Sequence, residues 1–307
     1  MQVKKKKLLH GWRAQPWQDK VFDVVNYAVM FVLLLIFVLP LYFVLIASIS
    51  DPAAVWNGEV VWHPVGANLN GYKAILQYTD IWTGYRNTII YTVVGTLVNL
   101  VMTVCAAFPL SRKDFMARNF FLGMFLATMF FSGGLIPTYL VVQRLNLINS
   151  PLAMILPSAV SVVNILITRT YLQNNIPDSL RESAELDGAG TLQFLLRIVL
   201  PLSGPILAVM ALYYGVARWN SYFDALIYLN SKQLYPLQMF LRDILIQNKV
   251  SVENMMGFNP SEMAVKAQLA ESIKYSVIIV ASVPLLAVYP FIQKYFVKGV
   301  MLGAIKG

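Results

Sequence analysis

Charge is what this sequence lacks most. Only 13% of its 307 residues are Asp, Glu, Lys or Arg, whereas 58% are hydrophobic. A soluble domain carries about 25% charged residues. The deficit, combined with several apolar runs of about 20 residues, excludes an ordinary soluble fold and predicts an all-α integral membrane protein.

Cysteine, histidine and nucleotide-binding motifs are also scarce or missing. The single cysteine, Cys105, excludes an internal disulfide. His10 and His63 lie far apart in the sequence, so we expect no metal site. The phosphate-binding pattern G-x-x-x-x-G-K-[ST] does not occur, so we do not expect this chain to bind ATP itself.

The apolar runs contain almost no acidic residues. A transporter driven by protons or sodium needs carboxylates inside its spans. A membrane-embedded hydrolase would need a catalytic constellation there. Both classes are therefore disfavoured, and we expect that the chain is not an enzyme.

Six apolar runs predict six transmembrane helices in one domain, residues 21–307, which follows a basic tail, residues 1–20. The first run is too long for the core of a signal peptide, and Pro40 is expected to kink it. In the third run, Gly133-Gly134 and Pro137 are expected to form a packing and kink site rather than a gate. The predicted spans are about 24–49, 87–110, 120–142, 151–172, 201–219 and 275–296.

Two longer loops, 51–85 and 220–274, join these spans. We expect a short interfacial helix near Gly71–Tyr78 and an amphipathic helix over Leu237–Gln247. With six spans, both ends and the 111–118 and 178–200 segments lie on one side. That side carries 15 of the 24 Lys and Arg residues and 7 of the 15 acids, so the positive-inside rule places it in the cytoplasm.

The segment 178–200 is unusual because it places five charges within ten residues, between two apolar runs. Ser179 and Glu182 have the spacing of a capping box, and Gly188 and Gly190 are expected to end the short helix. Thr191 is expected to cap a second helix whose Leu192, Leu195, Ile198 and Val199 face the membrane domain. An ordinary solvated loop is the alternative, but a plain connector needs no pair of capped helices.

One face of the first short helix looks suited to a partner protein. Leu180, Ala184 and Gly188 share this face at i, i+4 spacing, so it is apolar and nearly flat. Glu182 and Glu185 lie toward its flank, where they are available to a basic partner. We therefore predict that the segment is a docking element.

The residues of this segment resemble a known motif. Glu182-Ser183-Ala184, Asp187-Gly188-Ala189 and Ile198-x-Leu200-Pro201 resemble the EAA loop of ATP-binding-cassette (ABC) importer permeases, with Ser183 in place of the middle alanine. The fifth span, the amphipathic stretch and the C-terminal tail resemble the carbohydrate-uptake branch, the maltose-type second permease and its relatives for complex oligosaccharides.

The resemblance implies a type I ABC importer permease that conducts a sugar or oligosaccharide. It implies a second, homologous permease as heterodimer partner, two cytoplasmic ATPase subunits that hold ATP and Mg, and an extracellular binding protein. No cofactor is expected in this chain. The implied ATPase-docking residues are Leu180, Glu182, Ser183, Ala184, Asp187 and Gly188, and the implied ATPase-interface tail is Gly303, Ala304, Ile305, Lys306 and Gly307.

A contact with the binding protein is implied in the loop between the last two spans, at Asn254, Met255, Met256, Gly257 and Phe258. An amino-acid or peptide permease is the close rival, which the carbohydrate-type tail disfavours. No nucleic-acid partner is expected, since topology accounts for the basic charge.

Candidate sugar contacts cluster at the outer end of the fifth span. Aromatic faces with amide and hydroxyl groups suit sugar rings, although an interfacial aromatic belt has the same composition. Two asparagines inside spans could line the path or form interhelical hydrogen bonds. The candidates are Tyr213, Tyr214, Trp219, Asn220, Tyr222, Asn99 and Asn164.

Overall fold

A computed structural model describes residues 16–253, 268, 270 and 273–290 of the chain. Every regular element in this described part is helical. The chain divides into two units, residues 1–71 with 259–279 and residues 72–258 with 280–307, and each is described by itself. The predicted all-α class is confirmed.

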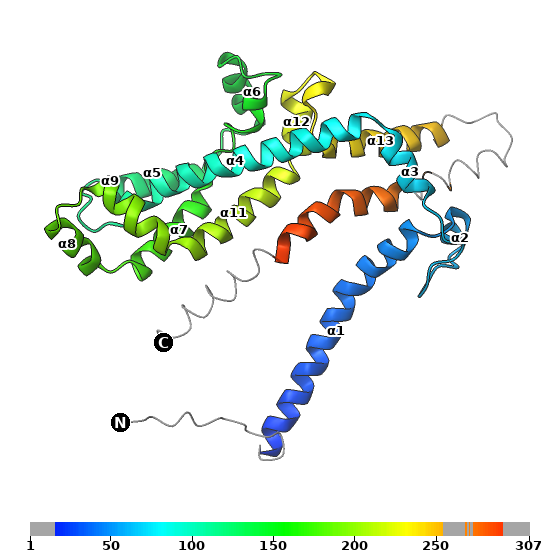
Figure 1. The fold of residues 1–307 in the computed structure, drawn as a ribbon, viewed down its shortest axis with the longest axis horizontal. Helices are drawn as coiled ribbons and strands as arrows, with labels where there is room; N and C mark the ends of the chain where they lie inside the picture. The colour runs from blue at the N-terminus through cyan, green and yellow to red at the C-terminus, as the bar shows by residue number, and fades with distance from the viewer. Residues whose placement is uncertain (1–15, 254–267, 269, 271–272, 291–307) are drawn as a thin grey trace. The chain divides into compact units, whose positions relative to one another are not determined.

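The first unit contains the long helix α1 (Trp17–Ser48), drawn in blue in Figure 1. Its 32 residues span about 48 Å at 1.5 Å per residue, more than the roughly 30 Å of a bilayer core. Pro40 lies inside this helix. The helix ends beside a loop that contains α2 (Pro52–Trp56), whose N-terminus is capped by the Asp51 carboxylate. The Tyr42 hydroxyl donates to the Trp62 carbonyl at 2.7 Å.

The second unit is organised around α4 (Asp80–Ser111), preceded by α3 (Asn70–Gln77). Helices α7 (Val162–Asn175), α11 (Gly204–Trp219) and α13 (Leu237–Glu253) pack against it, as the cyan, green and yellow ribbons of Figure 1 show. The predicted short helix near Gly71–Tyr78 is confirmed by α3. The second span begins at Asp80, seven residues earlier than predicted, because the polar residues before Asn87 extend the helix.

Two of the predicted spans are bent. Helices α5 (Arg118–Phe130) and α6 (Leu135–Arg144) meet at 115° around Gly134, which has a φ of +83° that favours glycine. The helix formed by α9 (Thr191–Phe194), the π-helical turn η3 (Leu195–Val199) and α10 (Leu200–Leu202) meets α11 at 80°. The glycine pair therefore breaks the third span, as predicted.

The fourth predicted span is not one helix. A 3-10 turn, η2 (Pro151–Met154), is followed by non-helical chain, and α7 starts only at Val162. Pro157 has no N–H for a helical bond, and the Ser161 hydroxyl accepts from the Asn164 N–H to begin a new helix. The predicted span 151–172 is therefore α-helical only from Val162 onward.

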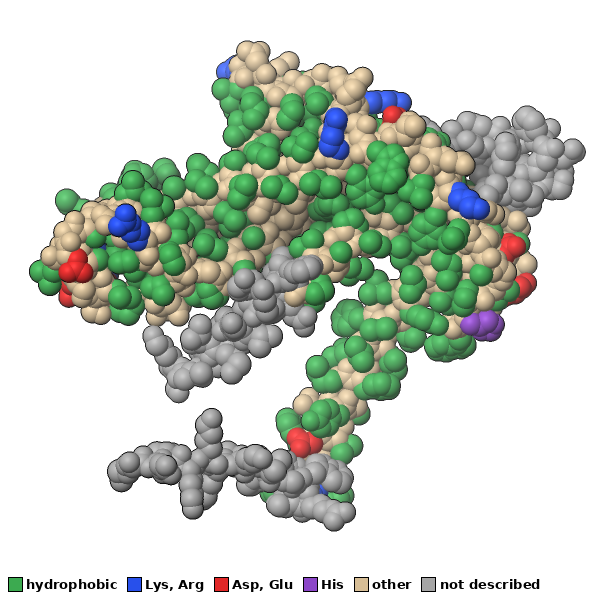
Figure 2. Space-filling view, viewed as in Figure 1, with side chains coloured by type: hydrophobic (Ala, Val, Ile, Leu, Met, Phe, Trp, Pro, Cys, Tyr) green, Lys and Arg blue, Asp and Glu red, His purple; other side chains and the backbone are tan. Residues whose placement is uncertain are grey.

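The described residues alone do not reach the predicted count of six spans, which stays a prediction. Helices α1, α4 and Ile273–Pro290 are each long and apolar enough to cross a membrane, and counting each bent pair as one span gives up to five. Helix α7, with 14 residues, is too short to be counted with them. Hydrophobic side chains cover most of the visible surface along the helices, whereas charged ones gather toward their ends (Figure 2).

The loop after α11 folds back onto α4. It contains α12 (Tyr222–Tyr228), the short turn η4 (Lys232–Leu234) and α13, which confirms the predicted amphipathic helix and extends it to Glu253. The Leu237 N–H donates to the Thr88 hydroxyl at 2.8 Å. Gly84 allows this close approach, since a Cβ there would lie 2.7 Å from the Phe240 ring.

Candidate functional site

The charged segment forms α8 (Asp178–Leu186), at the end of the second unit where α4 and α7 end and α5 begins (Figure 1). Pro177 is its N-cap and no side chain caps it, so the predicted Ser179–Glu182 capping box is wrong. Because Pro177 fixes the helix start two residues earlier, Ser179 lies inside the first turn. Its carbonyl accepts a hydrogen bond from the Ser183 hydroxyl instead.

The C-terminus of α8 follows the prediction. Gly188 has a φ of +80°, and its N–H donates to Glu185 O at 3.0 Å, while the Ala189 N–H donates to Ala184 O at 2.8 Å. These two bonds form a Schellman motif, in which a left-handed glycine ends the helix. The following helix begins at Thr191 but its N-cap is Gly190, so the predicted Thr191 cap is wrong.

The face of α8 that we predicted to be open is partly covered by the chain itself. Ala184 is only 6% exposed and packs in a cluster with Phe194 and Leu172, whereas Leu180 is 38% exposed. On the second helix Leu195, Ile198 and Val199 pack inward as predicted, but Leu192 is exposed. The inference that Ala184 offers a free flat surface is therefore corrected.

The opposite face of α8 is free in the described chain. Ser179, Glu182, Ser183 and Leu186 lie at i, i+3, i+4 and i+7 spacing and are exposed, and Leu186 is 90% exposed. Asp187 and Gly188 are exposed at its end. The structure thus presents Glu182, Ser183, Asp187 and Gly188 of the predicted docking set, and adds Leu186, which the motif did not single out.

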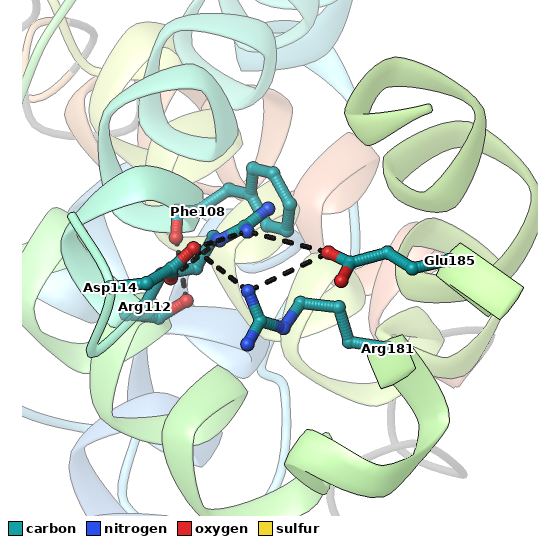
Figure 3. Close-up of polar contacts among 6 residues, drawn as sticks. Phe108, Arg112, Asp114, Arg181 and Glu185 are labelled. Carbon is teal, nitrogen blue, oxygen red and sulfur yellow. Dashed lines mark hydrogen bonds and ion pairs between the residues drawn. The ribbon is translucent and has the colours of Figure 1, made fainter. Parts of the chain in front are cut away.

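An ion-pair network ties α8 to the turn after α4, as Figure 3 shows. Arg112 donates to both Asp114 carboxylate oxygens, at 3.0 Å from Nε and 2.6 Å from Nη2. Arg181 of α8 donates to the same carboxylate at 2.8 Å and lies 3.6 Å from Glu185. Arg112 is also 3.9 Å from Glu185. Asp114 therefore bridges the end of α4 to the middle of α8.

This network acts on the acidity of its central carboxyl. The hydrogen bonds from Arg112 lower the pKa of Asp114 to about 2, with a smaller contribution from the nearby charge of Arg181. The same carboxylate raises the pKa of the Arg112 guanidinium through its hydrogen bond. Asp114 and Arg112 are therefore both charged at neutral pH.

A cleft of about 600 Å³ opens beside α8, lined by Arg118, Asn174, Asp178 and Arg181 among others. At its edge Lys113 bonds Asp178 at 3.0 Å. Because of this cleft, continuous packing does not hold the start of α8. Ion pairs to the 111–118 turn and the Ala184 cluster attach it instead.

The candidate sugar contacts separate into exposed and buried groups. Tyr213, Asn220 and Tyr222 are exposed. Tyr214 is buried and shares a 2.7 Å hydrogen bond with the Thr103 hydroxyl, and the buried Trp219 donates to Ala281 O at 3.0 Å. The two buried aromatics thus serve interhelical contacts in this structure.

Of the two intramembrane asparagines, Asn99 is fully buried and donates to Ser158 O at 2.7 Å. This geometry favours the interhelical alternative. Asn164 is 9% exposed, in the first turn of α7. The predicted binding-protein contact, 254–258, and the predicted tail, 303–307, lie outside the described residues.

Comparison with known proteins identifies the family. No family model matches the chain. A polygalacturonan/rhamnogalacturonan transport system permease protein (YtcP) of Bacillus subtilis (strain 168) is 39% identical over 94% of this chain and 100% of its own length. Protein LplC of the same organism is 37% identical over 94% of this chain and 96% of its own length. The chain belongs to the ABC importer permease family.

The solved structures agree. A bacterial ABC transporter involved in the import of the acidic polysaccharide alginate contains a chain with a TM-score of 0.79 and 30% identity, covering 92% of this permease and 99% of that chain. The predictions of a permease, of membrane location and of a transport subunit rather than an enzyme are confirmed. The orientation of the ends and the roles of single residues stay predictions.

The sequence prediction missed Arg218, the side chain with the most hydrogen bonds in the described part of the chain. Arg218 is 4% exposed near the end of α11 and donates to Asn99 and to the chain between η2 and α7. A charged residue inside a predicted span is a signal that was available in the sequence. Its acceptors could not be read there, because they lie about 60 and 119 residues away.

Proposed function

We propose that this permease forms, with a second homologous permease, the transmembrane path of an ATP-driven carbohydrate importer. The observation that carries the proposal is the 39% identity to the polygalacturonan/rhamnogalacturonan permease over nearly the whole of both chains. Further relatives include an arabinooligosaccharides permease and a diacetylchitobiose uptake permease. A carbohydrate cargo is favoured over an amino acid or peptide on this basis.

Within carbohydrates, an oligosaccharide of acidic sugars is the substrate class we favour. The relative YtcP is named for polygalacturonan and rhamnogalacturonan transport, and the structural neighbour is involved in the import of the acidic polysaccharide alginate. Tyr213, Asn220 and Tyr222 are exposed near the end of α11, where aromatic faces and polar groups suit sugar rings. These three residues are therefore our candidate substrate contacts.

We further propose that α8 is the coupling helix, on the cytoplasmic side, and that its free face docks into an ATPase subunit. Leu186 would supply the apolar anchor, since burying a side chain of this size contributes about 1.5–3 kcal/mol. Glu182, Ser183, Asp187 and Gly188 would surround it. ATP and Mg would bind the ATPase subunits, and an extracellular binding protein would deliver the sugar.

The ion-pair network would couple movement of the docked α8 to the membrane domain. A displacement of α8 acts on Arg181, whose bond to Asp114 pulls on the turn that follows α4. Helix α4 has 32 residues and contacts α7, α11 and α13, so a shift at its end would be passed to these three helices. Asp114 is a positioning residue in this proposal.

Substrate selectivity tests the proposal. The complete importer would be reconstituted in nanodiscs with its binding protein, and ATP hydrolysis would be measured with oligogalacturonides, neutral malto-oligosaccharides and dipeptides. We expect stimulation by the acidic oligosaccharide above all others. Stimulation by neutral sugars alone would overturn the acidic assignment, and stimulation by dipeptides alone would overturn the carbohydrate assignment.

A further inference from the structure

Arg218 holds together three parts of the second unit. Its Nε and Nη2 donate to Asn99 Oδ1 of α4, both at 3.1 Å. Nη2 also donates to Ile155 O and Ser158 O, each at 2.8 Å, and Nη1 donates to the Ser158 hydroxyl at 2.9 Å and to Met154 O. Helix α11, which carries Arg218, is thereby joined to α4 and to the chain before α7.

The acceptors of Arg218 are neutral oxygens, and most belong to the break between η2 and α7. The carbonyls of Met154, Ile155 and Ser158 lie where the 3-10 turn ends and a helix would have bonded them internally. Carbonyl oxygens at a helix end carry partial negative charge. The guanidinium therefore replaces the missing helical donors and is stabilised by these dipoles, with the charge of the nearby Asp224 carboxylate as a further favourable interaction.

The break lies at membrane depth. Helix α7 has 14 residues, which span about 21 Å, against a hydrocarbon core of about 30 Å. Its C-terminal end leads directly into the charged α8, which the proposed function places at the cytoplasmic membrane surface. The N-terminal end of α7, and with it the break, therefore falls short of the opposite surface and lies within the core.

The other side of this break is open in the described chain. Leu156 and Val160 are 46% and 40% exposed, and Pro157 and Ser158 are exposed as well. Neither backbone polar group of Val160 has a hydrogen-bond partner among the described residues. Non-helical backbone at membrane depth is tolerated where it faces water or protein, and not where it faces lipid.

We propose that segment 156–160 lines the aqueous route of the permease and that Arg218 and Asn99 are the positioning residues that hold it there. Arg218 binds the carbonyls of Met154, Ile155 and Ser158 on one side of the segment. The backbone polar groups of Val160, on the other side, are then left to face the route. Asn99 orients the guanidinium through Oδ1 and bonds Ser158 O through Nδ2, at 2.7 Å. The assignment rests on the proposed transport function, which supplies a water-filled route for the segment to line.

Thiol accessibility tests the first half of the proposal without measuring transport. In the complete complex, with Cys105→Ala as background, Val160→Cys would be treated with a membrane-impermeant maleimide from each side. The control is Val101→Cys, an exposed valine on the side of α4 away from Asn99. We expect faster labelling at position 160. Labelling no faster than at position 101 would overturn the lining assignment, whether or not the complex imports sugar.

The second half is tested by Arg218→Lys and Asn99→Ala. Lysine keeps the charge but lacks the planar fork that reaches several carbonyls at once. We expect each change to alter the labelling rate at Val160→Cys and to lower the maximal uptake rate by about tenfold, with a smaller effect on the KM. If the complex that carries Arg218→Lys does not assemble, the labelling and uptake of the Asn99→Ala complex alone test the positioning role. Unchanged labelling and uptake in assembled complexes would overturn the positioning role.

Discussion

Two regions of this permease are organised around arginine side chains, and they differ in what the arginines bind and in how exposed the site is to solvent. At the end of α4, Arg112 and Arg181 share a carboxylate that is 47% exposed. At the end of α11, Arg218 is 4% exposed and bonds neutral carbonyl, amide and hydroxyl oxygens. The first arrangement can loosen and re-form because water can replace each partner. The second is fixed because Arg218 is buried, so that a lost bond would leave a buried polar group without a partner.

The comparison assigns different tasks to the two regions. Exposed ion pairs contribute little to stability and are weakened by salt, which suits a joint that moves with a docked partner. A buried cation that satisfies several carbonyls is costly to disturb, which suits a fixed wall of the route. The following changes are ordered from the largest expected effect to the smallest.

Removal of the buried cation should have the largest effect. Arg218→Met leaves Asn99 and the carbonyls of the break without their donor. Since hydrogen bonds to charged groups contribute about 1.5–3 kcal/mol each, we expect a marked loss of folded complex, measured by thermal denaturation and size-exclusion chromatography. Arg144→Met removes an exposed arginine at the end of α6 and is the matched control. Equal stability of the two variants would contradict the account of Arg218.

A side chain at the glycine that ends α8 should have the next largest effect. Gly188→Val forces a β-branched residue to a φ of +80°, which costs about 1–2 kcal/mol. Gly188→Asn is the control, because asparagine tolerates this conformation. We expect the valine variant, and not the asparagine variant, to lose co-purification with the ATPase subunits. Normal co-purification of both variants would contradict the claim that the glycine-terminated end of α8 is needed for docking to the ATPase subunits.

Loss of the central carboxylate should weaken coupling with little effect on folding. In Asp114→Asn the bridge from Arg112 to Arg181 loses its charge, and an exposed pair contributes only about 0–1 kcal/mol. We therefore expect near-normal assembly but a lower ratio of transport to ATP hydrolysis. Asp178→Asn breaks only the exposed pair to Lys113 and is the control. An unchanged ratio in Asp114→Asn would show that α8 moves α4 by another route.

Mild acid should have the smallest effect. The folded pKa of Asp114 is lowered to about 2, so its contribution to stability is present above the unfolded value and is lost only as the pH falls through about 2. We expect the coupling ratio of the wild type relative to Asp114→Asn to stay constant from about pH 8 to pH 5. A ratio that fell toward that of Asp114→Asn near pH 5 would mean that the Arg112 bonds are weaker than the structure indicates.

The α8 region and the Arg218 region also differ in how much of each could be predicted from the sequence. The position of α8 was predictable because charged residues between two apolar runs are unusual. Its end was predictable because a glycine directly after a short helix commonly terminates it. The capping box was wrong because Pro177, which precedes Ser179, sets the helix start. The cover on Ala184 was not predictable, since Phe194 and Leu172 reach it through the packing of three helices.

The break in the fourth span escaped prediction for a different reason. Residues 151–160 are as apolar as a transmembrane helix, and hydropathy does not distinguish helical from non-helical chain. The donor that makes the break tolerable is Arg218, some 60 residues later in the sequence. An apolar run with an internal proline, together with a lone arginine in a later span, is the combined signal that would have indicated it.

Uptake by the complete complex in proteoliposomes is the most direct test of the account. Labelled oligogalacturonide would be supplied outside with the binding protein, and ATP would be enclosed within. We expect accumulation against the concentration gradient that requires ATP and is lost in Gly188→Val. Equal accumulation without ATP, driven by a proton or sodium gradient, would contradict the claim that this permease receives its energy through α8.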